Sequence, residues 1–221
     1  MRAIPEWVDR SLYPFEPKTF PLDIGTMSYV DQGAGKPIVM VHGIPYWSFE
    51  YRTLIRHFST GYRCIAPDHI GFGLSDKPID WDYLPEHHAE NLEALLESLD
   101  LTKITLVIND WGGPIGFSYA LRHPERIERI VVTNPWCWPV DDDWYYRAFS
   151  GFVGGPIGRT LIRRNNFFAR SIARAVYGDK SRLTPDIHRQ ILSPLAKPEE
   201  RKGTWVFPGQ IVGRSEERRV G

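Results

Sequence analysis

The chain has 221 residues, of which 42% are hydrophobic and 24% are charged, a composition that supports a packed core and excludes a chain disordered over most of its length. Its 27 basic and 27 acidic residues give no net formal charge, so the charge balance favours neither nucleic acid nor an anionic membrane surface as a partner. No apolar run approaches the roughly 20 residues of a membrane span, and the N-terminal segment lacks the apolar core of a signal peptide.

Short apolar segments alternate with helical patterns along the first 135 residues. This alternation predicts an α/β fold with a mostly parallel sheet and helices on both faces, which we assign to residues 1–135. The expected strands are Thr26–Val30, Pro37–Val41, Tyr62–Ala66, Ile104–Ile108 and Ile127–Thr133, and the expected helices are Trp47–Ser59, Leu84–Leu99 and Gly112–Arg122.

The pattern changes after Asn134. Tryptophan, proline and aspartate dominate Pro135–Asp143, and helical patterns follow without a further strand. Such a block predicts a helical cap, residues 136–213, over the sheet edge where ligands bind in α/β proteins. The expected helices are Tyr145–Phe152, Gly158–Arg164, Phe167–Val176 and Thr184–Ser193.

The most informative segment is Ile104–Gly116, which reads I-T-L-V-I-N-D-W-G-G-P-I-G. A buried strand followed by an acidic residue and two glycines predicts a nucleophile elbow, in which a side chain is exposed above the sheet. Asp110 occupies the position of the nucleophile, so the expected chemistry is attack by a carboxylate. The structural alternative is an aspartate that only caps the following helix.

A second motif, Val-His-Gly-Ile-Pro, follows the strand Pro37–Val41. In a hydrolase with such an elbow, the loop after this strand supplies one backbone N–H of the oxyanion hole, and the residue after the nucleophile supplies the other. Ile44 and Trp111 are the candidates. For His42, which directly precedes a glycine turn, we expect a structural hydrogen bond rather than a role as base.

Several motifs together resemble the haloalkane dehalogenases of the α/β-hydrolase fold. The elbow and the His-Gly-x-Pro loop are common to dehalogenases and epoxide hydrolases, and the continuation Trp-Ser-Phe-x-Tyr-Arg favours the former. The matching segments are H-G-I-P-Y-W-S-F-E-Y-R (His42–Arg52), A-P-D-H-I-G-F-G-L-S-D-K-P (Ala66–Pro78), N-D-W-G-G-P-I-G (Asn109–Gly116), N-P-W-C-W-P (Asn134–Pro139) and R-R-N-N-F-F (Arg163–Phe168).

The resemblance implies a two-step hydrolysis without a cofactor or a metal. Asp110 displaces halide to give an alkyl ester, with Trp111 donating a hydrogen bond to the halide. Activated water then hydrolyses the ester to an alcohol while the amides of Ile44 and Trp111 hold the oxyanion. Three aromatic side chains would line the substrate pocket, or else only pack within the cap: Trp136, Trp138 and Phe168.

Two positions depart from the family pattern. Many members carry asparagine where this chain has Ile44, and an isoleucine side chain cannot donate a hydrogen bond to the halide. Some members place the catalytic acid where this chain has Asn134. We therefore expect the acid to be an aspartate after a later strand.

That later strand is not in the sequence, which we expect to be truncated at the C-terminus, with an incomplete sheet. The segment Arg214–Gly221, R-S-E-E-R-R-V-G, resembles a translated sequencing adapter, and we exclude it from the fold. Without the base and the acid, the expectation for the fragment is an inactive protein that stops at the ester.

Two alternatives to a dehalogenase remain open: an epoxide hydrolase, which shares the elbow, and a noncatalytic binding protein of the same fold. The expected partners are a small apolar substrate, either a haloalkane or an epoxide, and water. Two cysteines cannot form a disulfide framework, so we expect reduced thiols and a cytoplasmic location. At full length we expect a monomer.

Overall fold

The computed structural model describes residues 3–135, 138, 140 and 142–217, with side chains up to residue 212. The chain forms two compact units. The first contains residues 1–78 and 85–136, and the second contains residues 79–84 and 137–221. None of the helices in the described part of the chain is long and apolar enough to cross a membrane.

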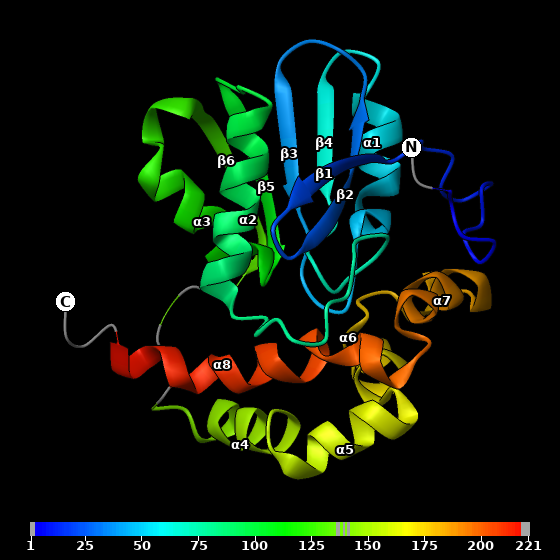
Figure 1. Ribbon diagram of the computed structural model, residues 1–221, viewed down its shortest axis with the longest axis vertical. Coiled ribbons are helices and arrows are strands. Elements are labelled where there is room, and N and C mark those ends of the chain that lie inside the picture. Colours follow the sequence, from blue (N-terminus) through cyan, green and yellow to red (C-terminus); the bar gives the residue numbers. More distant parts are fainter. Residues whose placement is uncertain (1–2, 136–137, 139, 141, 218–221) are drawn as a thin grey trace. The chain divides into compact units, whose positions relative to one another are not determined.

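The first unit contains a six-stranded sheet with the order β1-β2-β4-β3-β5-β6 (Figure 1). Strands β4, β3, β5 and β6 are parallel, and β1 and β2 join the sheet in antiparallel fashion. The mostly parallel sheet of the sequence prediction is therefore confirmed. The strands are β1 (Lys18–Leu22), β2 (Gly25–Gln32), β3 (Pro37–Val41), β4 (Arg63–Pro67), β5 (Ile104–Asp110) and β6 (Ile127–Pro135).

Three α-helices belong to this unit: α1 (Arg52–Phe58), α2 (Pro85–Ser98) and α3 (Gly112–Arg122). Helix α1 packs on β4, and α3 packs on β3, β5 and β6 with α2 beside it. All five residues of β3 are buried, as expected for a central strand covered on both faces. Short 3-10 turns complete the unit at η1 (Ser48–Tyr51) and η2 (Pro124–Arg126).

Strand β6 ends the sheet. It pairs with β5, and no other strand in the described residues pairs with its outer edge. Three of its apolar residues are exposed to solvent: Ile130 is 38% exposed, Val131 44% and Val132 50%. An apolar strand edge of this kind can pair with another chain.

The second unit is helical. Its elements are α4 (Trp144–Val153), α5 (Pro156–Asn165), a π-helical turn η3 (Phe168–Ile172), α6 (Ala173–Val176), η4 (Lys180–Arg182), α7 (Pro185–Leu192), η5 (Ser193–Leu195), η6 (Pro198–Arg201) and α8 (Gly203–Glu217).

Helix α8 organises this unit by packing along α4 and α5 (Figure 1). Close approach depends on glycines, because a Cβ added to Gly154 would lie 2.5 Å from Cα of Gly209. Ser150 Oγ donates to the carbonyl oxygen of Pro208 at 2.8 Å across the same contact. Buried Arg201 donates to the carbonyl oxygen of Leu195 at 2.8 Å.

Two elements were not predicted from the sequence. Strand β1 lies N-terminal to the first expected strand, and α8 falls beyond the last expected helix. The pattern of α8 is broken by Pro208 and by glycines. Residues 79–84, between β4 and α2 in sequence, pack with the second unit rather than the first.

Candidate active site

Asp110 is the last residue of β5, and α3 begins two residues later at Gly112. Its backbone has a φ of +50°, a left-handed conformation that a non-glycine residue adopts at a cost of about 1–3 kcal/mol. A Cβ added to Gly112 would lie 2.0 Å from the carbonyl oxygen of Val41. The glycine therefore lets the turn approach β3, and the strained strand–turn–helix geometry of an elbow is present.

The Asp110 carboxylate accepts two backbone hydrogen bonds. Oδ1 lies 2.9 Å from the amide nitrogen of Ile44, and the Trp111 amide donates to the same carboxylate. Burial raises the pKa of Asp110 to about 6, and these two hydrogen bonds oppose the shift. At pH 7 the carboxylate is therefore about 90% ionised.

The loop after β3 packs directly against this carboxylate. A Cβ added to Gly43 would lie 2.2 Å from Oδ1 of Asp110, so only glycine allows the loop to come this close. The structure thus brings Ile44, Asp110 and Trp111 together, as their motifs predict. The N-cap residue of α3 is Trp111, whose own side chain makes no capping hydrogen bond.

His42 has both ring nitrogens occupied. Its Nδ1 hydrogen-bonds to the carbonyl oxygen of Gly43 at 2.7 Å, and its Nε2 accepts from the amide of His69 at 3.0 Å. Burial, with a smaller contribution from His69, holds the pKa of His42 well below its usual value. A buried, neutral and fully bonded imidazole fits the structural role that we expected.

Two buried carboxyl groups near the loop were missed by the sequence analysis. Asp68 accepts from the amides of Ser48 at 2.7 Å and Leu74 at 2.8 Å, and burial raises its pKa to about 6. Glu50 lies in η1, and its Oε1 accepts from Nδ2 of Asn109 at 2.6 Å. Nothing in the local sequence marks either acid as buried.

The expected pocket residues belong to the second unit. Phe168 is buried, whereas Trp138 is 57% exposed and lines an open pocket of about 590 Å³ together with Val140, Asp142, Asp143, Trp144 and Tyr146. Trp136 lies outside the described residues. The role of these aromatic residues toward a substrate stays a prediction.

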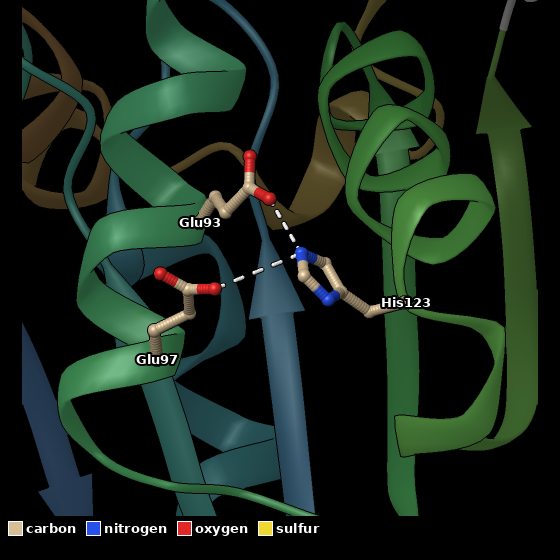
Figure 2. Close-up of side chains that lie close together, drawn as sticks. All are labelled: Glu93, Glu97 and His123. Atoms are coloured by element: carbon tan, nitrogen blue, oxygen red, sulfur yellow. Dashed lines mark hydrogen bonds and ion pairs between the residues drawn. The ribbon is translucent and has the colours of Figure 1, made fainter.

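A cluster of Glu93, Glu97 and His123 lies between α2 and the end of α3, and Figure 2 shows His123 directed at both carboxylates. His123 Nε2 is 2.5 Å from Oε1 of Glu93, and Arg122 is 2.6 Å from Oε2. Both oxygens of Glu93 are therefore used by cationic or hydrogen-bonding neighbours within the chain. This arrangement is explained by an ion-pair network that joins two helices.

The sequence profile of the α/β hydrolase fold matches residues 36–152. Among characterised proteins, haloalkane dehalogenase 2 of Mycobacterium tuberculosis is 35% identical over 92% of this chain and 70% of its own length. The cis-3-alkyl-4-alkyloxetan-2-one decarboxylase of Shewanella oneidensis is 38% identical over 91% of this chain and 64% of its own length.

Solved structures agree with these sequence relationships. The haloalkane dehalogenase DatA from Agrobacterium tumefaciens superposes with a TM-score of 0.81 and 26% identity, covering 91% of this chain and 73% of that one. A putative ancestral haloalkane dehalogenase superposes with a TM-score of 0.82 and 27% identity, covering 90% and 72%. Fold, elbow and sequence identity converge: the chain belongs to the haloalkane dehalogenase family of α/β-hydrolase-fold enzymes.

Proposed function

We propose that Asp110 is the nucleophile of a dehalogenase reaction on a small haloalkane. The observation that supports this proposal is the carboxylate itself, strained at a φ of +50° and aligned by the amides of Ile44 and Trp111. With a pKa of about 6, it is available as an anion at neutral pH.

In the first step, one carboxylate oxygen attacks the carbon that bears the halogen. A carbon–oxygen bond forms, the carbon–halogen bond breaks, and the halide leaves with the bonding electrons. Trp111 is the proposed donor to that halide. Ile44 offers no side-chain donor, and the loss of one charge-assisted hydrogen bond costs roughly 1.5–3 kcal/mol, or about one to two orders of magnitude in rate.

In the second step, water attacks the carbonyl carbon of the Asp110 ester, a base takes the proton of the water, and the alcohol leaves. The backbone amides of Ile44 and Trp111 would hold the oxyanion, because they already point at the carboxylate. The base expected for the family is a histidine, and no histidine of the described residues hydrogen-bonds to Asp110. The first step is therefore the sharper test of this site.

The test is a single-turnover reaction with 1-bromobutane. We expect bromide release together with a butyl group on the peptide that contains Asp110, detected by mass spectrometry. Asp110→Asn should abolish both, and Asp23→Asn, at an exposed aspartate, should change neither. Bromide release that survives in Asp110→Asn, or a butyl group on another residue, would overturn the assignment.

A second candidate is decarboxylation of an oxetan-2-one, a four-membered lactone ring that loses carbon dioxide to leave an alkene. The 38% identity to the Shewanella oneidensis decarboxylase favours it, as does the apolar side chain of Ile44, where a halide donor is expected. Carbon dioxide and alkene formed from a cis-3,4-dialkyl oxetan-2-one, without halide release from any haloalkane, would decide for this reaction.

Trp138 and Phe168 are the proposed substrate-contacting side chains in the described residues, with Trp136 outside them. Alanine at either position should raise KM more than it lowers kcat. A monomeric state at full length and a cytoplasmic location complete the proposal.

A further inference from the structure

Glu50 is a partly buried acid beside the nucleophile, and the proposed two-step reaction does not use it. Its carboxyl group accepts a hydrogen bond from Nδ2 of Asn109 at 2.6 Å and another from the Gly43 amide. Asn109 directly precedes the nucleophile, and Gly43 directly precedes the residue whose amide binds Asp110. One carboxyl group therefore joins the two segments that form the site.

The second oxygen of Glu50 is poorly placed for a negative charge. Oε2 is buried and has no hydrogen-bond partner among the described residues. An ionised oxygen without a donor is far more costly to bury than a neutral one. Geometry alone therefore favours a protonated Glu50.

The charges around Glu50 point the same way. Burial, followed by repulsion from Asp110, raises the pKa of Glu50 to about 8, against the opposing hydrogen bonds from Asn109 and Gly43. Tyr51 is the other ionisable group coupled to this pair. Its hydroxyl donates to the carbonyl oxygen of Val41 at 2.9 Å, and burial raises its pKa well above the usual value, so it stays neutral.

We propose that Glu50 is a positioning residue for Asp110, which in its protonated form links Asn109 to Gly43 and on ionisation slows hydrolysis of the Asp110 ester. This inference rests on the proposed role of Asp110 as the nucleophile. It adds a second carboxyl group, held neutral, to the machinery of the elbow.

The effect on the second step follows from the charge of each state. The ester at Asp110 is neutral, whereas the tetrahedral intermediate that leads from it carries one negative charge. An ionised Glu50 repels that charge and leaves the ester unaffected. The first step gains no such barrier, because it moves negative charge away from Asp110 onto the departing halide.

The first test is a titration that needs no turnover. With ¹³C-labelled glutamate and aspartate carboxyl groups, NMR should show a Glu50 midpoint near pH 8, as the pKa of about 8 requires. In Asp110→Asn that midpoint should fall, because the neighbouring charge is gone. A Glu50 midpoint near the ordinary value of 4.5 in both proteins would overturn the inference.

The second test follows the decay of a preformed butyl ester at Asp110 in hydroxylamine, a nucleophile that works without a protein base. The wild-type rate should fall as the pH rises through the Glu50 pKa, which lies below about 8 in the ester because Asp110 no longer carries the charge that helps to raise it. In Glu50→Gln, which keeps the shape and stays neutral, the change should be less than twofold.

Two variants separate this role from simple packing. Glu50→Leu removes the link to Asn109 and should slow ester decay at every pH without a pH-dependent part. Glu97→Gln, at an acid that is 54% exposed, should retain the wild-type profile. Equal pH profiles in wild type and Glu50→Gln would overturn the inference. If no ester forms in the wild type, the proposed function fails, and the titration by itself decides whether Glu50 and Asp110 are coupled.

Discussion

The amide nitrogen of Ile44 lies 2.9 Å from Oδ1 of Asp110, across a sequence separation of 66 residues. This contact joins the loop after β3 to the end of β5, because the two strands are neighbours in the sheet. A hydrogen bond from a rigid loop to a carboxylate is the arrangement that stabilises an oxyanion later formed on the same group. The contact therefore links the fold to the proposed chemistry.

Removal of the Asp110 charge should stabilise the protein. The pKa of Asp110 is about 6 in the folded protein, against an ordinary value of 3.8. The wild type therefore loses stability as the pH rises from about 4 to about 6, and above pH 6 the loss stays constant. Asp110→Asn should therefore be more stable by about 1–3 kcal/mol at pH 7. Urea denaturation at pH 4 and pH 7 checks this, and an advantage that is equal at both pH values would contradict it.

Gly43→Ala should impair ester formation by at least about a hundredfold, because the new methyl group would lie 2.2 Å from Oδ1 of Asp110 and a misplaced nucleophile loses its alignment. Gly61→Ala is the matched control, since a Cβ at Gly61 has no atom within 4 Å. Single-turnover bromide release measures both variants. Comparable rates for the two would show that the loop can move away at little cost.

The buried histidines should make the fold sensitive to acid. Burial lowers the pKa of His69 to about 4 from 6.5, so its contribution to stability is complete above pH 6.5 and is lost as the pH falls toward 4, by about 3 kcal/mol. The raised pKa values of Asp68, Asp110 and Glu50 act in the opposite direction. A comparison of wild type with His69→Gln cancels those shared effects.

As the pH falls from 7 to 4.5, the wild type should lose more unfolding free energy than His69→Gln does. Chemical denaturation at several pH values measures this difference. His57→Gln, at an exposed position, controls for the loss of a histidine elsewhere. A constant difference across this range would mean that His69 accepts a proton in the fold as easily as in the unfolded chain.

The ion-pair network between α2 and α3 should depend on one carboxylate more than on the other. Glu93 is 20% exposed in its side chain and contacts both Arg122 and His123, whereas Glu97 is 54% exposed and 3.9 Å from His123. Glu93→Gln should cost about 1–2 kcal/mol of unfolding free energy, and Glu97→Gln less than about 0.5 kcal/mol. Equal losses would contradict this difference in burial and contacts between the two carboxylates.

The open edge of β6 should promote self-association. Val131→Lys, at a residue that is 44% exposed on this strand, should reduce aggregation because a charge on an edge strand opposes pairing with another chain. Light scattering at increasing protein concentration measures the effect, and Val131→Thr is the neutral control. Equal aggregation of the lysine and threonine variants would contradict a role of the β6 edge in self-association.

Much of the framework follows from local pattern. The apolar run at Ile104–Ile108 and the glycines after Asp110 predict the elbow, because strand and turn propensities agree there. Strand β1 was not predictable in this way, since its residues Lys18–Leu22 are partly polar and, within the described part of the chain, pair only with β2. Helix α8 was missed because Pro208 interrupts its pattern, although packing against α4 maintains it.

The site was predictable only in part. Asp110 and Trp111 lie in the elbow motif, and Ile44 lies in the His-Gly-Ile-Pro motif, so all three could be identified from the sequence. Glu50 and Asp68 could not be recognised as buried acids, because burial is decided by segments distant in sequence, such as Asn109 for Glu50. Charge and solvation at a site are properties of the assembled sheet edge rather than of any one motif.

The absence of a side chain at Gly43 also has a consequence for protein engineering. Gly43, in the loop after β3, leaves the space that the side chain of Asp110 at the end of β5 occupies. Libraries that vary the two loops separately will therefore recover mostly the parental residues at these positions. New chemistry at this elbow should be sought by randomising residues 43 and 110 in the same clone.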